Sequence, residues 1–248
     1  MSNKYIFTYA TIMIVIVAAL LSTAATVLKP FQEANARAAK MVEILKSFGV
    51  ESSREQADEL FNRYIVEEIA ISSGGEVMSL YQKGKKVRGG DTRPFELDMK
   101  KELKKQLAGE PATFPLYKAQ KEGKIFYVIP LYGKGLWGPI WGYIALKDDL
   151  KTVSGVTFGH KGETPGLGAE IEKLPFQEQF KNKVIWDAKG NFTPIDVVKG
   201  GVNNLAAGQQ LHSVDGISGG TLTSNGVDAM LDNVLRIYKN YIVALRKK

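Results

Sequence analysis

A run of glycine and hydroxyl residues, DGISGGT from Asp215 to Thr221, holds the residue types with the clearest chemical use in this sequence. An amphipathic helical pattern follows it, so the run leads to a helix N-terminus. The free N–H groups and the positive end of the helix dipole at such a terminus favour a phosphate group, to which the Thr221 hydroxyl could be esterified. The same residue types suit an ordinary helix cap, with Ser224 or Thr223 as the capping residue. Residue types alone leave both interpretations open.

A second glycine-rich run, GHKGETPGLG from Gly159 to Gly168, places Glu163 and Thr164 next to each other. Glycines let backbone N–H groups approach a ligand closely, and the two polar side chains could hydrogen bond to a polar ring edge or to ribityl hydroxyls. The alternative is an ordinary surface loop, because Gly and Pro are also the usual residues of loops. This run is informative only in combination with the others.

A third run, GKGLWG from Gly133 to Gly138, has the GxGxxG spacing of a dinucleotide-binding loop. Such a loop must open a helix. Here Pro139 and a β-branched, aromatic stretch follow, so we expect a glycine-rich hairpin instead. Trp137 at this turn could lie against a planar ligand, although it and Trp141 could equally pack on a sheet.

Helical and strand patterns around these runs predict the elements that position them. Segments with helical periodicity are 31–48, 53–65, 98–107 and the stretch from Val227 to Leu245. Strands are expected from about Ile69 to Leu146, the clearest being 125–132 and 139–146, and a third lies at 153–158. Helices at both ends with strands between them predict an α+β domain with a mainly antiparallel sheet and flanking helices.

An uncharged, apolar run extends from Tyr5 to Leu28. As a helix it would be about 36 Å long, enough to cross a hydrocarbon core of about 30 Å. A cleaved signal peptide is the alternative, but its apolar region is usually shorter. The run contains no ionisable residue, so we expect a membrane anchor without an ion path. Basic residues are more numerous after the run than before it, which by charge alone would favour a cytoplasmic domain.

The composition excludes several kinds of site. The chain has no cysteine and two histidines, which rules out thiolate-held iron–sulfur clusters, disulfides and cysteinyl flavin links within it. We expect no metal site. The net charge of +7 comes from scattered residues without a nucleic-acid recognition pattern, so a nucleic-acid partner is not expected. A redox role would therefore need an organic cofactor or a metal site supplied by a partner.

Together, the three runs resemble the C subunit family of the sodium-translocating NADH:quinone reductases. The family's FMN-binding domain has a GxETPGLG loop, an attachment sequence DxxSGAT and a GLWGPxWGYIA segment; this chain has GHKGETPGLG, DGISGGT and GLWGPIWGYIA. The similarity extends to the anchor and the helix after it, with Pro30 and Asn35. It implies a single-pass inner-membrane protein whose FMN domain lies on the extracytoplasmic side. The resemblance further implies that this domain would relay electrons within an oxidoreductase complex whose other subunits oxidise NADH, reduce quinone and conduct the ion.

The resemblance also assigns roles to individual residues. It places the flavin-bearing threonine, joined to FMN by a phosphoester bond, at Thr221. A flavin transferase that uses FAD would recognise Asp215, Ser218 and Gly219 during maturation. The family's usual alanine is replaced by Gly220, which is expected to loosen the turn but leave the hydroxyl accessible. The other residues expected around the cofactor are Trp137, Glu163, Thr164, Leu167, Gly168 and Thr223.

Two other functions fit the same motifs. One is the G subunit of the related ion-translocating ferredoxin:NAD reductase complex, which contains the same domain. The other is a membrane-anchored domain without a redox step that binds a metabolite reversibly. The tryptophan-containing segment favours the sodium pump subunit. We expect an anchor over 1–29, a helical stalk and start of the domain over 30–68, and the FMN-binding α+β domain over 69–248.

Overall fold

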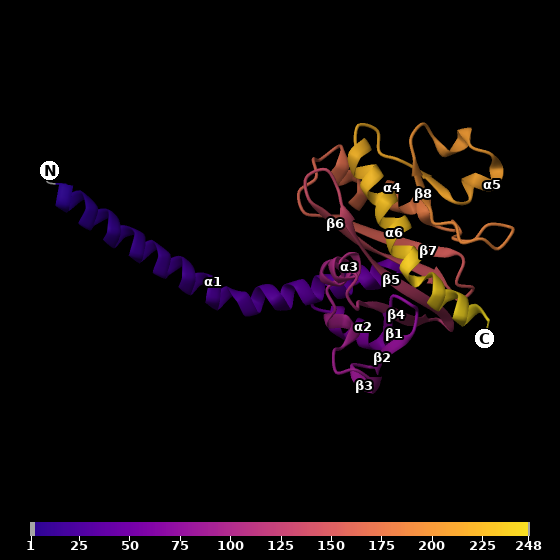
Figure 1. The fold of residues 1–248 in the computed structure, drawn as a ribbon, viewed down its shortest axis with the longest axis horizontal. Helices are drawn as coiled ribbons and strands as arrows, with labels where there is room; N and C mark the ends of the chain where they lie inside the picture. Colours follow the sequence, from indigo (N-terminus) through magenta and orange to yellow (C-terminus); the bar gives the residue numbers. More distant parts are fainter. Residues whose placement is uncertain (1–2, 248) are drawn as a thin grey trace.

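In this computed structural model, which describes residues 3–247, a long N-terminal helix projects from an α+β domain (Figure 1). The helices are α1 (Asn3–Ser47), α2 (Ala57–Tyr64), α3 (Met99–Leu107), α4 (Leu174–Gln177), α5 (Ala207–Gln210) and α6 (Thr221–Arg246). The strands are β1 (Ile65–Ser72), β2 (Val77–Gln82), β3 (Lys85–Gly89), β4 (Thr113–Lys121), β5 (Lys124–Lys134), β6 (Pro139–Lys147), β7 (Val153–His160), β8 (Asp196–Val198) and β9 (Ser213–Asp215). Short 3-10 helices are η1 (Pro94–Glu96), η2 (Gly168–Glu172), η3 (Glu178–Phe180) and η4 (Val202–Asn204).

Strands β1 to β7 form one antiparallel sheet in the order β3-β2-β1-β4-β5-β6-β7. The short strands β8 and β9 pair in parallel in a separate sheet. The three strands that the sequence predicts most clearly are confirmed as β5, β6 and β7, and the charged helix is confirmed as α3. The α+β class with a mainly antiparallel sheet and flanking helices is therefore correct.

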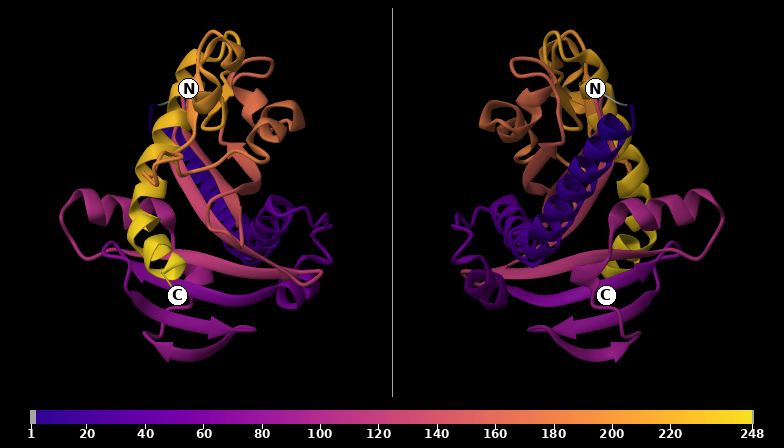
Figure 2. Two further views of the ribbon diagram at one scale, coloured as in Figure 1. Left: turned by 90° about the vertical axis from the view of Figure 1, so that its right-hand side faces the viewer. Right: turned by 90° about the vertical axis from the view of Figure 1, so that its left-hand side faces the viewer.

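Each face of the large sheet buries its own apolar core. Side chains alternate between the two faces along a strand. In β5, Ile129 and Leu131 therefore join the core under α6, whereas Phe126 and Val128 join the core formed with α2 and the end of α1. Figure 2 shows the sheet lying between α6 on one side and the inner end of α1 with α2 on the other.

Helix α1 runs without interruption from the apolar segment into the domain. Its residues from Asn3 to Arg37 are exposed, whereas Met41, Ile44 and Leu45 are buried in the domain. Among residues 3–247 it is the one helix long and apolar enough to cross a membrane. Pro30 lies inside it and lacks the N–H of one backbone hydrogen bond; the helix bends on its way to the domain (Figure 1). The segments expected as anchor and stalk thus form one continuous helix across the boundary expected at residue 29.

Two element boundaries differ from the sequence pattern. Helix α2 begins at Ala57 rather than near residue 53, and it ends at Tyr64. Ile65 belongs to β1, so the sheet begins earlier than the expected Ile69. The apolar residues within 65–71 follow the helical period poorly, and the segment pairs with β4. This strand pairing decides its conformation.

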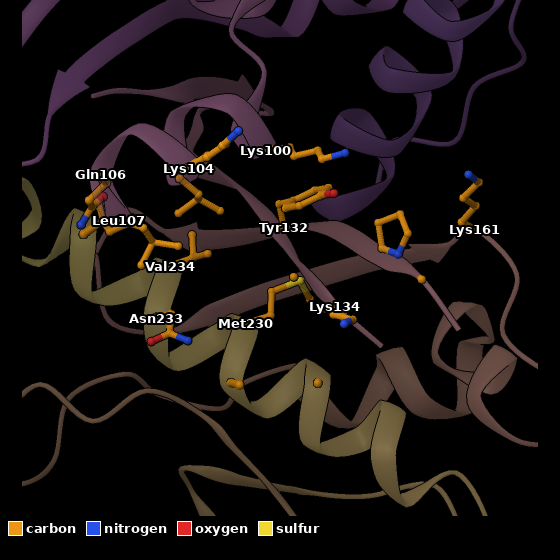
Figure 3. Close-up of a pocket in the computed structure, with 17 residues that line it drawn as sticks. Lys100, Lys104, Gln106, Leu107, Tyr132, Lys134, Lys161, Met230, Asn233 and Val234 are labelled. Carbon is orange, nitrogen blue, oxygen red and sulfur yellow. The ribbon is translucent and has the colours of Figure 1, made fainter. Parts of the chain in front are cut away.

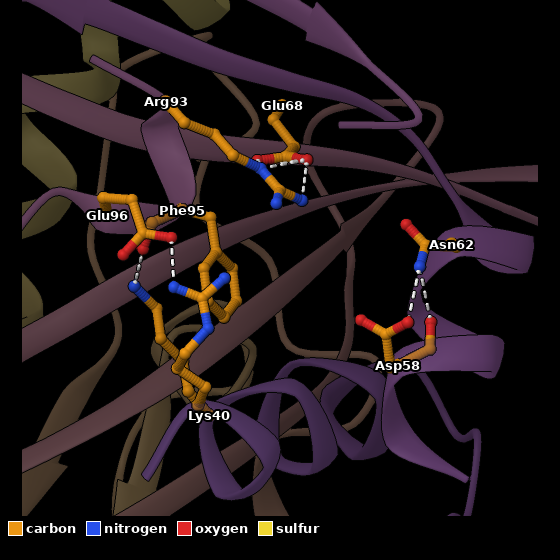
Figure 4. Close-up of polar contacts among 8 residues, drawn as sticks. Lys40, Asp58, Asn62, Glu68, Arg93, Phe95 and Glu96 are labelled. Atoms are coloured by element: carbon orange, nitrogen blue, oxygen red, sulfur yellow. Dashed lines mark hydrogen bonds and ion pairs between the residues drawn. The ribbon is translucent and has the colours of Figure 1, made fainter. Parts of the chain in front are cut away.

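A cluster of charged side chains ties α1 to the sheet where the helix enters the domain (Figure 4). Glu68 of β1 is buried, and the Arg93 guanidinium donates to both of its carboxylate oxygens at 2.6 to 3.0 Å. Lys40 of α1 lies over the Phe95 ring, with its Nζ 4.4 Å from the centroid, and donates to the Phe95 carbonyl. Burial lowers the pKa of the Lys40 ammonium from 10.5 to about 8.

We predict that Lys40 makes the free energy of unfolding rise with pH between about 8 and 10.5. In this window the folded protein has released the Lys40 proton, whereas the unfolded chain still holds it, so the unfolded state binds more protons and stability increases with pH. The lowered pKa of Lys40 corresponds to an increase of at most about 3 kcal/mol in the free energy of unfolding across this window. Denaturant unfolding of the full chain in detergent, from pH 7 to 10, measures this pH dependence, and Lys40→Met is the variant with which the wild type is compared. A stability difference between the two proteins that stays constant with pH would contradict the prediction.

Candidate functional site

The three glycine-rich runs of the sequence meet around the carboxylate of Glu163, a residue only 4% exposed. Its Oε1 accepts a hydrogen bond from the backbone N–H of Trp137 at 2.9 Å. Its Oε2 accepts one from the Thr223 hydroxyl at 2.5 Å. Glu163 therefore connects the β5–β6 turn, the loop after β7 and the first turn of α6.

Two glycines leave room for this carboxylate. A Cβ atom at Gly168 would lie 2.4 Å from Thr223 Oγ1 and 2.5 Å from Glu163 Oε2, and a Cβ atom at Gly135 would lie 2.6 Å from Glu163 Oε1. Interiors are close-packed, so any larger residue at either position would displace the carboxylate. The run around Gly135 forms a hairpin between β5 and β6, as expected, and not the start of a helix.

His160 holds the same loop, a role that the sequence pattern did not indicate. Its Nδ1 accepts a hydrogen bond from the backbone N–H of Glu163 at 3.0 Å, so the neutral ring carries its proton on Nε2. Nε2 lies 3.5 Å from Glu172 Oε2. The separation of three residues between His160 and Glu163 is the signal that would have suggested such a local contact from side chain to backbone.

The chain reaches α6 through a tight turn that Ser224 stabilises. Ser224 Oγ accepts a hydrogen bond from the backbone N–H of Ile217 at 2.9 Å, and Gly219 has a φ of +74°, which favours glycine. Gly220 is the N-cap residue and has no side chain with which to cap the helix. The hydroxyls of Ser224 and Thr223 bond to the preceding loop and to Glu163, so the expectation that one of them caps α6 is wrong.

Thr221 is the first residue of α6, and it is exposed. Within the described part of the chain, the backbone N–H groups of Thr221, Leu222 and Thr223 have no hydrogen-bond acceptor. These free groups, at the positive end of a helix of 26 residues, favour an anion such as a phosphate group. The Thr221 hydroxyl lies on the same turn, so a phosphoester at this oxygen fits the site.

Exposed apolar side chains surround the start of α6. Trp137 is 68% exposed, Leu222 61% and Leu167 41%. The Trp137 indole N–H donates to Thr164 Oγ1 at 3.2 Å, and Leu167 packs against the backbone of Gly219. Large apolar groups beside a terminus that favours phosphate suit a planar ring system joined to a phosphate.

The structure brings together most of the residues that the sequence indicates for this site. Those in mutual contact around the start of α6 are Trp137, Glu163, Thr164, Leu167, Gly168, Gly219, Gly220 and Thr223, with Thr221 directly after Gly220. Asp215 and Ser218 are exposed residues of the loop before α6. The Asp215 carboxylate accepts from the Val202 N–H at 2.5 Å, and its own N–H donates to Gln179 at 2.8 Å.

We predict different effects on stability for two threonines of the first turn of α6. Thr223→Val removes the hydroxyl that bonds to Glu163 and leaves a buried carboxylate oxygen without a partner, so it should lower the free energy of unfolding by about 2 kcal/mol. The matched variant Thr221→Val changes an exposed hydroxyl and should alter stability by no more than about 0.5 kcal/mol. Denaturant unfolding of protein produced without flavin compares the two. Equal losses would show that the contact between Thr223 and Glu163 does not hold the turn.

Comparison with known proteins identifies the family of this chain. The FMN-binding domain family matches residues 135–236. Over 224 residues the chain is 34% identical to the C subunit of the Na(+)-translocating NADH-quinone reductase of Vibrio parahaemolyticus, covering 86% of this chain and 83% of that protein. The crystal structure of the C subunit from Parabacteroides distasonis has a TM-score of 0.72 at 39% identity, covering 87% of this chain and 96% of the other. That of Shewanella oneidensis NqrC has a TM-score of 0.66 at 25% identity, covering 86% and 98%. The chain therefore belongs to the C subunit family of the Na(+)-translocating NADH-quinone reductases.

Proposed function

We propose that this chain carries FMN, joined through its phosphate to Thr221 Oγ1, and relays electrons as a subunit of a sodium-translocating NADH:quinone reductase. The observation that carries the proposal is the position of Thr221. This exposed threonine begins α6, beside three free backbone N–H groups and close to exposed apolar side chains. Family membership supports FMN as the ligand.

Different residues of the site would hold different parts of the cofactor. When bound, FMN supplies the ring that accepts and releases electrons. The N–H groups at the start of α6 would hold its phosphate, and Trp137 and Leu167 would contact its ring. Both carboxylate oxygens of Glu163 already bond within the protein, so Glu163 positions the turn and the helix, while Thr164 keeps an exposed hydroxyl for a polar part of the ligand.

Attachment would use FAD as the donor of the FMN group. The Thr221 oxygen would form a bond to the phosphorus of the FMN half, the pyrophosphate bond would break, AMP would leave and the hydroxyl proton would be released. A flavin transferase that reads Asp215, Ser218 and Gly219 can reach them, because all three are exposed. Gly220 is buried: a Cβ atom there would lie 3.0 Å from Ile217 Cγ2, so the alanine usual in the family would pack more tightly here.

The N-terminal helix supports a membrane location for this carrier. We propose that residues 1–29 anchor the chain as a single pass, that 30–68 connect the anchor to the sheet, and that 69–248 hold the flavin on the extracytoplasmic side of the inner membrane. Among residues 3–247, the apolar part of α1 is exposed and belongs to neither core of the domain, so it suits a lipid environment. Other subunits of the reductase are then its partners.

We predict that Thr221→Ala abolishes covalent flavin and leaves the fold intact, because the exposed Thr221 hydroxyl is the proposed attachment point and lies outside the buried core. Thr221→Ser keeps a hydroxyl without the methyl group that restricts its rotamer and should be modified in part. Protein made in a host with the transferase is denatured, separated on a gel and viewed under ultraviolet light. Intact-mass measurement should then show an added mass equal to FMN minus water on the wild type.

Thr223→Val is the matched control for this experiment. It lacks the neighbouring hydroxyl but keeps Thr221, so it should still carry covalent flavin. A fluorescent band on Thr221→Ala, or a dark band on the wild type from cells that contain the transferase, would overturn the assignment. The dark band would favour reversible binding of a metabolite without a redox step.

We also predict that Trp137→Ala and Leu167→Ala keep the flavin attached but change its environment. Loss of an aromatic contact of about 1 kcal/mol to one redox state would shift a two-electron potential by about 20 mV. Spectroelectrochemical titration and the flavin absorption spectrum measure the change. Leu211→Ala, which alters an exposed leucine outside the site, is the control. Potentials and spectra equal to wild type in both site variants would remove these side chains from the ring contacts.

A further inference from the structure

A groove of about 770 Å³ lies between α3 and α6, next to the flavin site but outside it (Figure 3). Its floor is apolar and comes from Leu103 of α3, Tyr132 of β5, and Met230, Val234 and Ile237 of α6. Along α6 the groove extends from Gly226 to Ile237, which corresponds to about 16 Å, or about three helical turns.

The rim of this groove is strongly basic. Lys100 and Lys104 of α3, Lys134 at the end of β5 and Lys161 after β7 line it, and no Asp or Glu is among the described residues that do so. None of these lysines forms an ion pair with another described side chain. Figure 3 shows Lys104, Lys100 and Lys161 following one another along the side of the groove opposite α6. A row of unpaired cations above an apolar floor matches a row of carboxylates on one face of an amphipathic helix.

One end of the groove leaves groups without a partner. Leu107, on the rim at the end of α3, is 90% exposed. Gln106 also lines the groove, and its buried Oε1 has no hydrogen-bond partner among the described residues. An apolar side chain this exposed at the rim is a feature expected of a surface that another chain covers, whereas the buried Gln106 oxygen is not itself open to such a chain.

The opposite end of the groove reaches the flavin site. Lys134 directly precedes Gly135, which lies against the Glu163 carboxylate, and Lys161 lies two residues before Glu163. Gly226 of α6 lets the helix approach the Lys134 carbonyl, since a Cβ atom there would lie 2.3 Å from that oxygen. A helix seated in the groove would therefore lie beside the end of α6 that carries Thr221.

We propose that this groove binds an acidic amphipathic helix of another subunit of the reductase, and so holds an electron-transfer partner next to the flavin. The apolar face of that helix would cover Leu103, Met230 and Val234, and its carboxylates would pair with the lysines of the rim. The proposal rests on the proposed place of this chain in the complex, but not on the bond at Thr221. In-gel flavin fluorescence tests that bond separately.

Photo-crosslinking in the assembled complex tests the proposal. A photoreactive benzoylphenylalanine is introduced at Leu107 of the full chain, and at Val87 on β3 as an exposed control outside the groove. After irradiation of purified complex, mass spectrometry identifies the attached molecule. We expect Leu107 to capture a peptide of another subunit in which acidic and apolar residues recur at helical spacing, and we expect Val87 not to capture it. Capture of a lipid, a small molecule or a peptide without acidic residues, or no crosslink at all, would overturn the proposal.

Charge reversal gives the matched second test. The double variant K100E/K104E should lower the yield of that crosslink at least fivefold, or about 1 kcal/mol of binding free energy. Lys83→Glu with Lys85→Glu makes the same change of charge on the exposed β2–β3 turn and should leave the yield unchanged. Flavin fluorescence and melting temperature equal to wild type establish that both double variants fold. Equal crosslink yields from K100E/K104E and wild type would refute the ion pairing.

Discussion

The buried carboxylate of Glu163 is the contact on which the functional end of the domain depends. A buried charge is stable only when hydrogen bonds satisfy its oxygens, and here one oxygen is bonded to the β5–β6 turn and the other to the first turn of α6. Moving either the turn or the helix would remove one of the two hydrogen-bond donors to the Glu163 carboxylate, and moving the loop would remove both. His160 fixes the backbone of the same loop from the other side, so loop, turn and helix keep one arrangement.

This arrangement separates the roles of two neighbouring threonines. Thr223 faces inward and holds Glu163, whereas Thr221 begins the helix and faces solvent. The absence of a side chain at Gly220 leaves the first N–H groups of α6 free for an anion. The long apolar stripe of α6 packs over β5, so the free terminus sits on a well-buried element rather than on a mobile loop.

The other face of the sheet connects the same domain to the long apolar helix α1. Lys40 and the paired charges of Glu68 and Arg93 meet around Phe95 where α1 enters the core. Because α1 is one continuous helix, this cluster fixes the direction of its apolar segment relative to the sheet, and the sheet carries α6 on its opposite face. The position of the start of α6 relative to the apolar segment of α1 thus follows from packing on both faces of one sheet.

The sequence by itself determined the elements whose patterns are local: the apolar N-terminal helix, strands β5 to β7, the charged helix α3 and the stripe of α6. It also identified the three glycine-rich runs, because glycine is needed wherever backbone or side chains approach closely. Only the tertiary structure decided which groups the hydroxyls of Thr223 and Ser224 bond to. Capping preferences pointed to Thr223 or Ser224. In the structure, however, the Thr223 hydroxyl bonds to Glu163, sixty residues away, and the Ser224 hydroxyl accepts a hydrogen bond from the Ile217 N–H. Contacts between distant segments leave no local pattern, and for that reason the role of His160 and the basic groove between α3 and α6 also emerge only from the folded chain.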